Sequence, residues 1–452
     1  MEVTDTKKSE PNRKLERAWS MYDWANSVFP LSITTAIFPV YYEGVTRKAS
    51  IAAGMATETD YYIDFLGHRF LNTALYSYSL SFAFLLIAIV QPLLSGIADV
   101  KGRKKTFMQF FCYIGASSSA MLYYFDSNHI GAGILFFILA MIGFAGSIVF
   151  YNAFLPEITT EDRYDRVSAR GFAMGYFGSV LLLIVNLSLI ILTEKPADGG
   201  EPMITFISQE MATRMAFVMV GLWWAGFAQI TFANLPKESK LKRGGAITHG
   251  FYELKKVFNE IKQKPEISKY LRSFFFVSMG LQTVMYVASL FGAKELNLPS
   301  IHLIGAVLVI NLIGIPGSLF FSWISGKIGN MLTLRLLVVI WIFVCLIAYY
   351  INTAAQFYML GALVGSVMGG IQSLFRSTYA KLIPDDTLDH ASYFSFYDVT
   401  EKLAIVFGTF AFGYIEEVTE SMRSSAAALG VFFAIGLLFM IRIKNFKGIH
   451  AG

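Results

Sequence analysis

The sequence predicts an all-α polytopic membrane protein that crosses the bilayer twelve times. Charged residues make up only 15% of the 452, and hydrophobic residues make up 55%, whereas a typical soluble domain has about 25% charged residues. The mean hydropathy is +0.53. The apolar residues are gathered in stretches of about 20 residues, the length at which a helix spans a bilayer. Together these observations exclude a soluble globule.

The twelve expected spans are separated by polar segments, most of them short. Each span is long enough to cross the hydrocarbon region as one helix, with boundaries accurate to about 2 to 4 residues. We place the spans at 22–42, 75–97, 106–125, 130–155, 172–192, 213–235, 270–291, 301–324, 332–351, 357–382, 393–415 and 424–443.

The positive charges predict the orientation of the spans. An even number of crossings puts both termini on one side, and Lys and Arg gather on the cytoplasmic side. If that side carries the termini, 28 Lys/Arg are cytoplasmic and 6 are external, leaving Arg214, Arg376 and Lys402 in or beside spans. We therefore expect a cell-membrane protein with cytoplasmic termini. Topology and contact with anionic lipid explain the net charge of +5, so we expect no nucleic-acid partner.

The longest polar segment divides the spans six and six. The expected parts are a six-helix bundle at 1–235, a cytoplasmic linker at 236–268 and a second six-helix bundle at 269–452. Apolar residues in the linker are spaced three and four apart, which predicts an amphipathic helix, either on the membrane surface or as a solvated connection. These residues are Phe251, Leu254, Val257, Phe258 and Ile261.

Polar side chains recur in every third span, at spans one, four, seven and ten. Such groups are costly in hydrocarbon, so we expect them to face protein or water and to surround one cavity that binds solute. The alternative is that they join helices to one another. The candidates are Tyr22, Asp23 and Asn26 in span one, Asn152 in span four, Gln282 in span seven, and Gln372 and Arg376 in span ten.

Two of these candidates carry opposite charges. Asp23 suits an ammonium group and Arg376, with its bidentate fork, suits a carboxylate, so an amino acid or short peptide fits better than a sugar. Alternatively, Arg376 reaches the membrane interface or braces a gate.

Span eleven carries Asp398, Glu401 and Lys402. Asp398 precedes Lys402 by four residues, the favourable order for an ion pair within a helix. Glu401 is then left as an acid that could take up and release a coupling proton.

Enzyme and cofactor motifs are absent from the sequence. It has no Gly-rich phosphate loop, His-Glu-x-x-His motif or nucleophile elbow. Cys112 and Cys345 fall inside expected spans, so we expect no metal cluster or disulfide framework from them. The expected partners are a small solute, membrane lipids and a proton or another coupling ion, with the chain itself a monomer.

The loop at 94–105, LSGIADVKGRKK, resembles the signature loop between helices two and three of the major facilitator superfamily. The resemblance implies that Asp99 faces the N-terminal end of span eleven, that Gly102 permits a tight turn, and that Arg103 and Lys104 pair across the halves. A weaker copy follows span eight, where Gly329 corresponds to Gly102.

Six further strings are similar to the vacuole effluxer Atg22-like (UMF1) family. They are YDWANSVF at 22–29, FYNAFLPE at 150–157, SARGFAMGY at 168–176, GLQTV at 280–284, GGIQSLFR at 369–376 and FYDV at 396–399 with Lys402. The resemblance implies the major facilitator fold and a secondary transporter with rocker-switch alternating access, and for fungal members the export of amino acids. Ser395 and Glu401 stand where the family usually has small residues.

Three functions follow as hypotheses. The first is a carrier that moves a small polar or zwitterionic solute outward. The second is a lipid or lysolipid flippase, which needs a lateral opening lined by apolar residues. The third is a membrane sensor or assembly partner that transports nothing, in which Asn26, Asn152 and Gln372 bond to one another in a collapsed centre.

Overall fold

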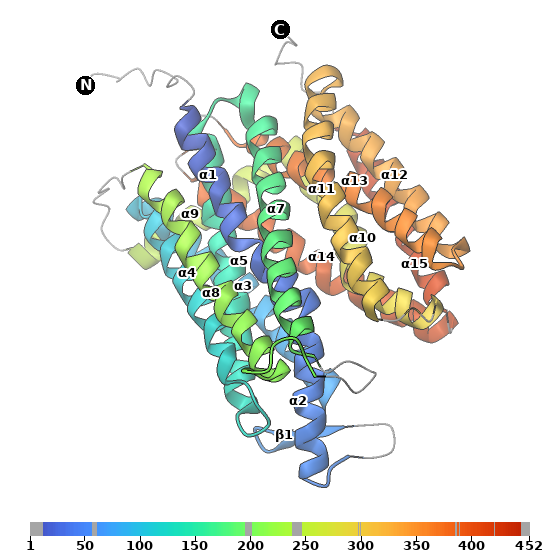
Figure 1. Cartoon of the computed structure of the whole chain (residues 1–452). Coiled ribbons are helices and arrows are strands. Elements are labelled where there is room, and N and C mark those ends of the chain that lie inside the picture. Colours follow the sequence, from blue (N-terminus) through green and yellow to red (C-terminus); the bar gives the residue numbers. More distant parts are fainter. Residues whose placement is uncertain are drawn as a thin grey trace, which may run out of the picture.

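Long helices lying side by side make up the protein (Figure 1). The computed structural model describes residues 12–56, 61–194, 201–236, 246–296, 298, 300–384, 387, 389–419 and 421–443. Among these residues, nine helices are long and apolar enough to cross a membrane. The predicted all-α membrane fold is confirmed, and the count of twelve spans fits but stays a prediction.

Each expected span after the first coincides with a helix. In the first half these are α3 (Asn72–Lys101), α4 (Lys104–Met121), α5 (Ile130–Ala153), α7 (Tyr164–Leu192) and α8 (Gln209–Asn234), with the single turn α6 (Leu155–Ile158) after α5. In the second half they are α10 (Pro265–Leu296), α11 (Ser300–Ile328), α12 (Asn330–Tyr350), α13 (Ala354–Leu382), α14 (His390–Thr419) and α15 (Met422–Ile441). Several of them extend beyond the expected ends, because helices in membrane proteins continue past the hydrocarbon region.

The first span is a broken helix. It consists of α1 (Arg13–Asn26), a π-helical segment (Pro30–Ala36) and α2 (Phe38–Ala52). Pro30 has no N–H to continue the α-helical hydrogen bonds, and its carbonyl instead accepts hydrogen bonds from the hydroxyls of Thr34 (2.5 Å) and Thr35 (2.9 Å). The sequence placed this span at 22–42, so its continuation to residue 52 is a correction.

A two-stranded hairpin follows α2 where the sequence indicated only a loop. Strand β1 (Tyr62–Phe65) pairs antiparallel with β2 (His68–Leu71). Leu66 (φ 51°) and Gly67 (φ 79°) both have positive φ, as tight hairpin turns of this length require. We call this end of the molecule the hairpin end, and the opposite end, where α1 begins and α15 ends, the terminal end (Figure 1).

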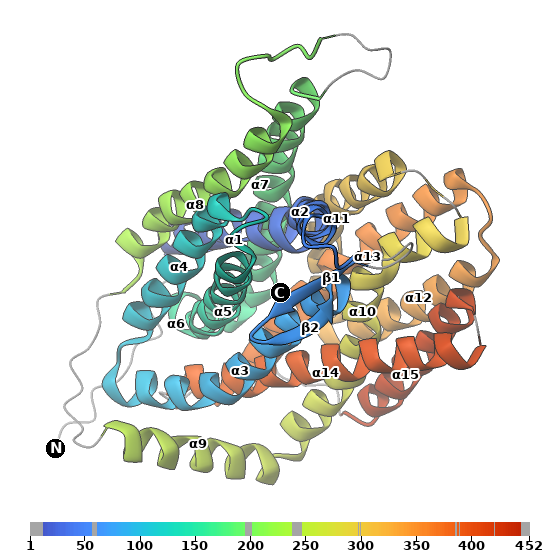
Figure 2. The ribbon, with the colours of Figure 1, turned by 90° about the horizontal axis from the view of Figure 1, so that it is seen from below.

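The helices form two groups with a shared boundary. Helices α1, α4, α5 and α8 lie on one side, and α10, α12, α13 and α15 lie on the other (Figure 2). The groups meet where α7 packs on α11 and where α3 packs on α14. We refer to α1–α8 as the first group and α10–α15 as the second. The predicted domain boundaries at 235 and 269 stay predictions.

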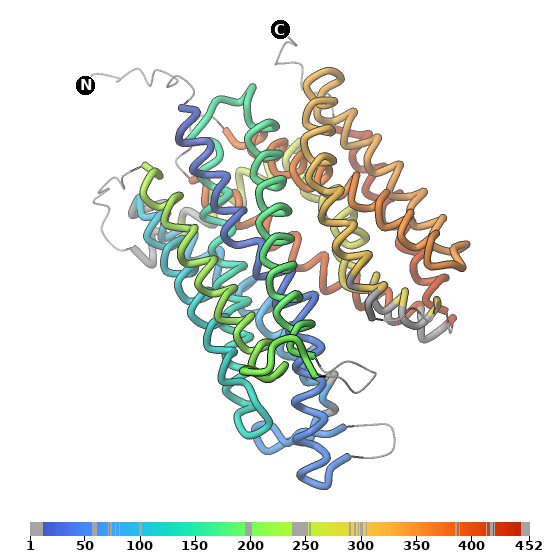
Figure 3. The backbone as a smooth tube through the Cα atoms, in the orientation of Figure 1, coloured from blue at the N-terminus to red at the C-terminus, as the bar shows by residue number. Residues whose placement is uncertain are grey.

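The linker contains helix α9 (Ala246–Gln263), as the amphipathic spacing predicted. It packs mainly along α3 and also contacts α14 and α10, with Val257 and Ile261 buried. In Figure 2 it runs beside α3, and Figure 3 traces the backbone of the whole chain from the viewpoint of Figure 1. Lys256 Nζ lies 2.9 Å from Asp389 Oδ2, and the Tyr393 hydroxyl donates to Glu260 Oε2 at 2.6 Å. Phe251 and Leu254 have side chains outside the described residues.

Candidate functional site

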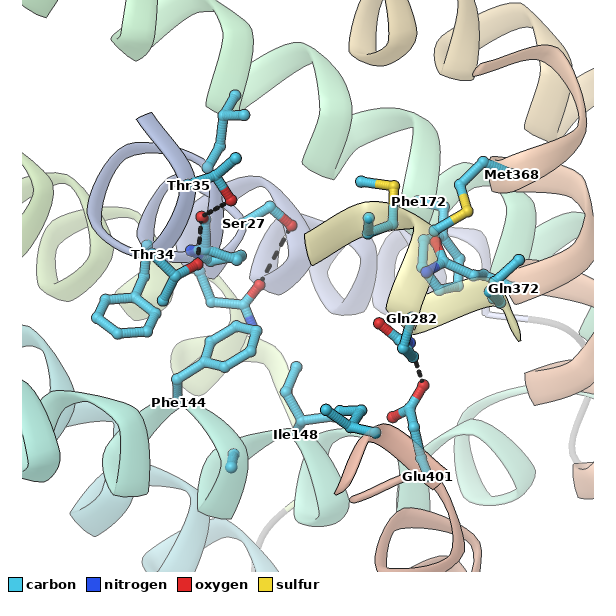
Figure 4. Close-up of a pocket in the computed structure, with 18 of the residues that line it drawn as sticks. Ser27, Thr34, Thr35, Phe144, Ile148, Phe172, Gln282, Met368, Gln372 and Glu401 are labelled. Carbon is cyan, nitrogen blue, oxygen red and sulfur yellow. Dashed lines mark hydrogen bonds between the residues drawn. The ribbon is translucent and has the colours of Figure 1, made fainter. Parts of the chain in front are cut away.

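A cavity of about 330 Å³ lies between the two groups. Helices α1, α5 and α7 of the first group and α10, α11, α13 and α14 of the second supply most of its lining (Figure 4). Six of the seven predicted solute-binding residues line it: Asp23, Asn26, Asn152, Gln282, Gln372 and Arg376. The polar residues of spans one, four, seven and ten therefore converge, although their binding of solute stays a prediction.

Tyr22 does not line the cavity, which corrects its expected position. It is fully buried inside the first group, with its ring 5.1 Å from that of Tyr151 and 5.9 Å from that of Phe232. Neighbouring residues on a helix point about 100° apart, so the turn that directs Asp23 and Asn26 toward the cavity directs Tyr22 into the core. Tyr22 is a packing residue of this helix.

Asp23 and Arg376 form an ion pair across the boundary between the groups. Arg376 Nη1 lies 3.2 Å from Asp23 Oδ2, and the Tyr151 hydroxyl donates to the same oxygen at 2.8 Å. Asp23 is 5% exposed and Arg376 is 4% exposed. The sequence indicated two separate charges for the two ends of a zwitterion. In this structure the two charges compensate each other.

Further contacts hold Arg376 against α7. Its Nε donates to Ser168 Oγ at 2.8 Å and its Nη2 donates to the Ser168 carbonyl at 2.7 Å. The guanidinium carbon lies 4.3 Å from the ring centroid of Phe172 and 4.9 Å from that of Trp19, within the range of cation–π attraction. Arg376 is buried and joins the groups, so it does not reach the membrane interface. Sequence reasoning missed Ser168 and Trp19, which carry no charge to mark them.

Gly171 makes room for this ion pair. A Cβ atom at this position would lie 2.2 Å from Asp23 Oδ2 and 2.8 Å from Arg376 Nη2. No side chain fits at those distances unless the pair moves. The glycine therefore fixes how closely α7 approaches the two charges.

A second charged cluster lies on α14 at the same cavity. The predicted ion pair is confirmed, since Lys402 Nζ lies 2.6 Å from Asp398 Oδ1. Glu401 does not share it. Its Oε1 accepts a hydrogen bond from Gln282 Nε2 of α10 at 2.8 Å (Figure 4).

Polar contacts also join the groups at the terminal end. Asp165 of α7 lies 2.7 Å from Lys381 Nζ and 2.6 Å from Asn330 Nδ2. Glu157 Oε1 of α6 lies 3.3 Å from His390 Nδ1. We call Asp165, Asn330, Lys381, Glu157 and His390 the terminal latch. The sequence did not predict it, because these residues stand at helix ends where charged side chains are ordinary.

The signature loop behaves partly as the resemblance implied. Gly102 and Gly329 have φ of 62° and 86°, so both short turns need glycine. Lys104 lies 2.6 Å from Glu157 within its own group, and it is Glu157 that reaches the second group. Arg103 is exposed. The expected pairing of Arg103 and Lys104 across the halves stays a prediction, and the side chain of Asp99 lies outside the described residues.

One more buried acid stabilises the terminal end of the first group. Glu16 accepts hydrogen bonds from Arg163 Nε, Arg163 Nη2 and the Thr159 hydroxyl, each at 2.6 Å. Burial raises the pKa of the Glu16 carboxyl, but these bonds and the Arg163 charge outweigh it, so the pKa is lowered overall. Glu16 therefore stays ionised and ties α1 to the turn before α7.

Comparison with solved structures identifies the fold. The human organic anion transporter MFSD10 matches with a TM-score of 0.68 at 13% identity, covering 96% of this chain and 100% of that one. The proton:xylose symporter XylE matches with a TM-score of 0.69 at 12% identity, covering 98% of each chain. The fold is the major facilitator fold, and the chain is a transporter of the MFS type.

The sequence comparisons place the chain more narrowly. The family model described as "Vacuole effluxer Atg22 like" matches residues 11–452, so the chain belongs to that family. The uncharacterized MFS-type transporter YxiO of Bacillus subtilis is 29% identical over 429 residues, which are 94% of each chain. Autophagy-related protein 22-1 of Penicillium rubens is 22% identical over 97% of this chain and 91% of that protein.

Proposed function

We propose that this transporter moves a small zwitterionic solute, such as an amino acid, outward across the cell membrane. The observation that carries the proposal is the Asp23–Arg376 pair, which places one carboxylate and one guanidinium beside the cavity on opposite groups. A zwitterion can replace this pair, with its ammonium on Asp23 and its carboxylate on Arg376. Both buried charges then stay compensated with or without solute, which avoids the penalty of an unpaired buried charge.

The contacts between the groups support alternating access. The described hydrogen bonds between the groups lie at the cavity, as between Tyr176 and Gln372 (3.2 Å), or on its terminal side, as in the terminal latch. At the hairpin end none is described between the groups. With cytoplasmic termini, this arrangement is a state closed toward the cytoplasm. Breaking the Asp23–Arg376 pair and the latch lets the groups rock to a state open toward it.

The other two functions make different demands on the centre of the molecule. A sensor with a collapsed centre requires Asn26, Asn152 and Gln372 to bond to one another. Here they line a cavity, and Gln372 accepts from Tyr176 instead. A flippase requires a lateral opening lined by apolar residues. Transport of lysolipids in the flux test described next would favour this function over the proposed one.

Flux into proteoliposomes tests the proposal. Purified protein is reconstituted, and uptake of labelled amino acids, dipeptides and lysolipids is measured. We expect amino-acid flux in the wild type and a loss of about tenfold or more in Asp23→Asn and in Arg376→Gln, since each leaves one partner unpaired. Tyr22→Phe is the matched control, because Tyr22 packs outside the cavity, and it should keep its flux. Unchanged amino-acid flux in both charge variants contradicts the proposal.

A further inference from the structure

The charges that line the cavity do not balance. Among the described residues that line it, the charged ones are Asp23, Asp398 and Glu401 against Arg376 and Lys402. Asp23 pairs with Arg376 at 3.2 Å and Asp398 pairs with Lys402 at 2.6 Å. Glu401 is the carboxylate left over, and its described partner is the neutral amide of Gln282.

An ionised carboxylate facing a cavity inside the membrane is costly without a cation. Among the described residues, the groups around Glu401 provide no cation besides Lys402. On α10 its titratable neighbour is Tyr286, and on its own helix the neighbours are Tyr397, Asp398 and Lys402. Lys402 is already held by Asp398. Across the cavity, Asp23 and Arg376 hold each other, so Glu401 needs either a proton or a cation from outside the protein.

We propose that Glu401 binds the coupling proton, holding it while the cavity is empty and releasing it when the ammonium group of the solute occupies Asp23. This inference rests on the proposed function and adds its coupling. When the ammonium binds Asp23, it adds a positive charge to the cavity, and the proton leaves Glu401 for water. When the solute departs, a proton from water returns. The two cations exclude each other, so each solute exported is exchanged for one proton.

Gln282 positions this site. Its Nε2 donates to Glu401 Oε1 and leaves Oε2 for the proton. The bond joins α10 to α14, so Glu401 stays directed at the cavity (Figure 4). A divalent metal is a poor alternative, because no group of three or more metal-binding side chains occurs among the described residues.

Two measurements separate the coupling from the identity of the solute. The first is an infrared titration of the purified protein without solute, which follows the C=O band of protonated carboxyl groups. We expect the wild type to show a titrating band that Glu401→Gln lacks. Glu43→Gln is the control, because Glu43 is an exposed acid on α2, and it should retain the band. The same band in Glu401→Gln would overturn the proposal even if no transported solute had been found.

The second measurement uses proteoliposomes loaded with labelled amino acids and an internal pH dye. An inward proton gradient should accelerate wild-type efflux by about tenfold, because each solute that leaves is exchanged for a proton that enters. Efflux should therefore carry protons inward. In Glu401→Gln, exchange of amino acids should persist, while its response to the gradient should vanish. If the variant responds as the wild type does, coupling through Glu401 is wrong although transport itself stands. If a sodium gradient replaces the proton gradient, the site binds sodium and the proposal also fails.

Discussion

At the residue scale, the site depends on two ion pairs and one unpaired acid. Breaking a buried pair by removing one partner usually costs about 3–5 kcal/mol, because the remaining charge is uncompensated. Under the proposed alternating access, Asp23 and Arg376 form a contact that the closed state needs and the other state must release. Arg376 also holds Ser168 and lies over Phe172, so this contact ties α13 to α7 as well as to α1.

Gly171→Ala tests the close fit around this pair. Replacing glycine with alanine inside a helix normally stabilises it by about 0.5–1 kcal/mol. Here the added methyl group would lie 2.2 Å from Asp23 Oδ2, and overpacking of this kind costs about 1–3 kcal/mol. We expect a lower thermal unfolding temperature and a loss of amino-acid flux.

The control for Gly171→Ala is Gly226→Ala on α8. A Cβ atom at Gly226 would meet nothing within 4 Å, so this variant should be as stable as the wild type or slightly more so. If both substitutions gave the same thermal shift, Gly171 would not fix the geometry of the ion pair.

At the element scale, sequence patterns located the helices but not their neighbours. The hydrophobic stretches mark the spanning helices from α3 to α15, though not the linker helix α9, because a span must be apolar over its whole length. The first span breaks at Pro30 because proline interrupts helical hydrogen bonds, a detail that the expected single span at 22–42 does not describe. The hairpin at 62–71 was not predicted, because its two short strands and the Leu66–Gly67 turn leave only a weak pattern in the sequence. The latch at Asp165 was not predicted either, because its polar side chains meet only after the helices pack.

Close packing of α11 on α13 gives an element-scale prediction. A Cβ atom at Gly317 would lie 2.2 Å from the Ser366 carbonyl oxygen, and backbone cannot move aside as a flexible side chain can. We expect Gly317→Ala to lower the free energy of unfolding by about 1–3 kcal/mol, measured as a fall in the thermal midpoint. Gly326→Ala in the same helix meets nothing within 4 Å and should not destabilise. A stable Gly317→Ala variant would mean that α11 and α13 pack less tightly than described.

At the scale of the whole molecule, the spacing of the polar spans predicted which helices line the central cavity. Spans one, four, seven and ten converged as expected, because identical spacing in two six-span halves puts equivalent helices at the centre. The motif resemblance indicated Arg103 and Lys104, yet the described contacts between the groups run through Glu157 and Asp165. A motif specifies which residue types occur at given positions. Which partner each charged side chain contacts depends on how the two helix groups pack against each other.

Alternating access requires the two ends of the molecule to move together, one end opening while the other closes. Spin labels on Arg13 and Lys327 report the terminal end, and labels on Val40 and Ala355 report the hairpin end, in a background where the buried Cys112 and Cys345 are replaced by alanine. Asp165→Asn weakens the terminal latch by removing the charge that Lys381 binds.

Distances between these labels, measured by double electron–electron resonance with and without Asp165→Asn, test the central claim most directly. We predict that the variant lengthens the distance at the terminal end and shortens the distance at the hairpin end, as alternating access to one central cavity requires. Distances that stay unchanged at both ends, or that lengthen at both ends together, would contradict the account.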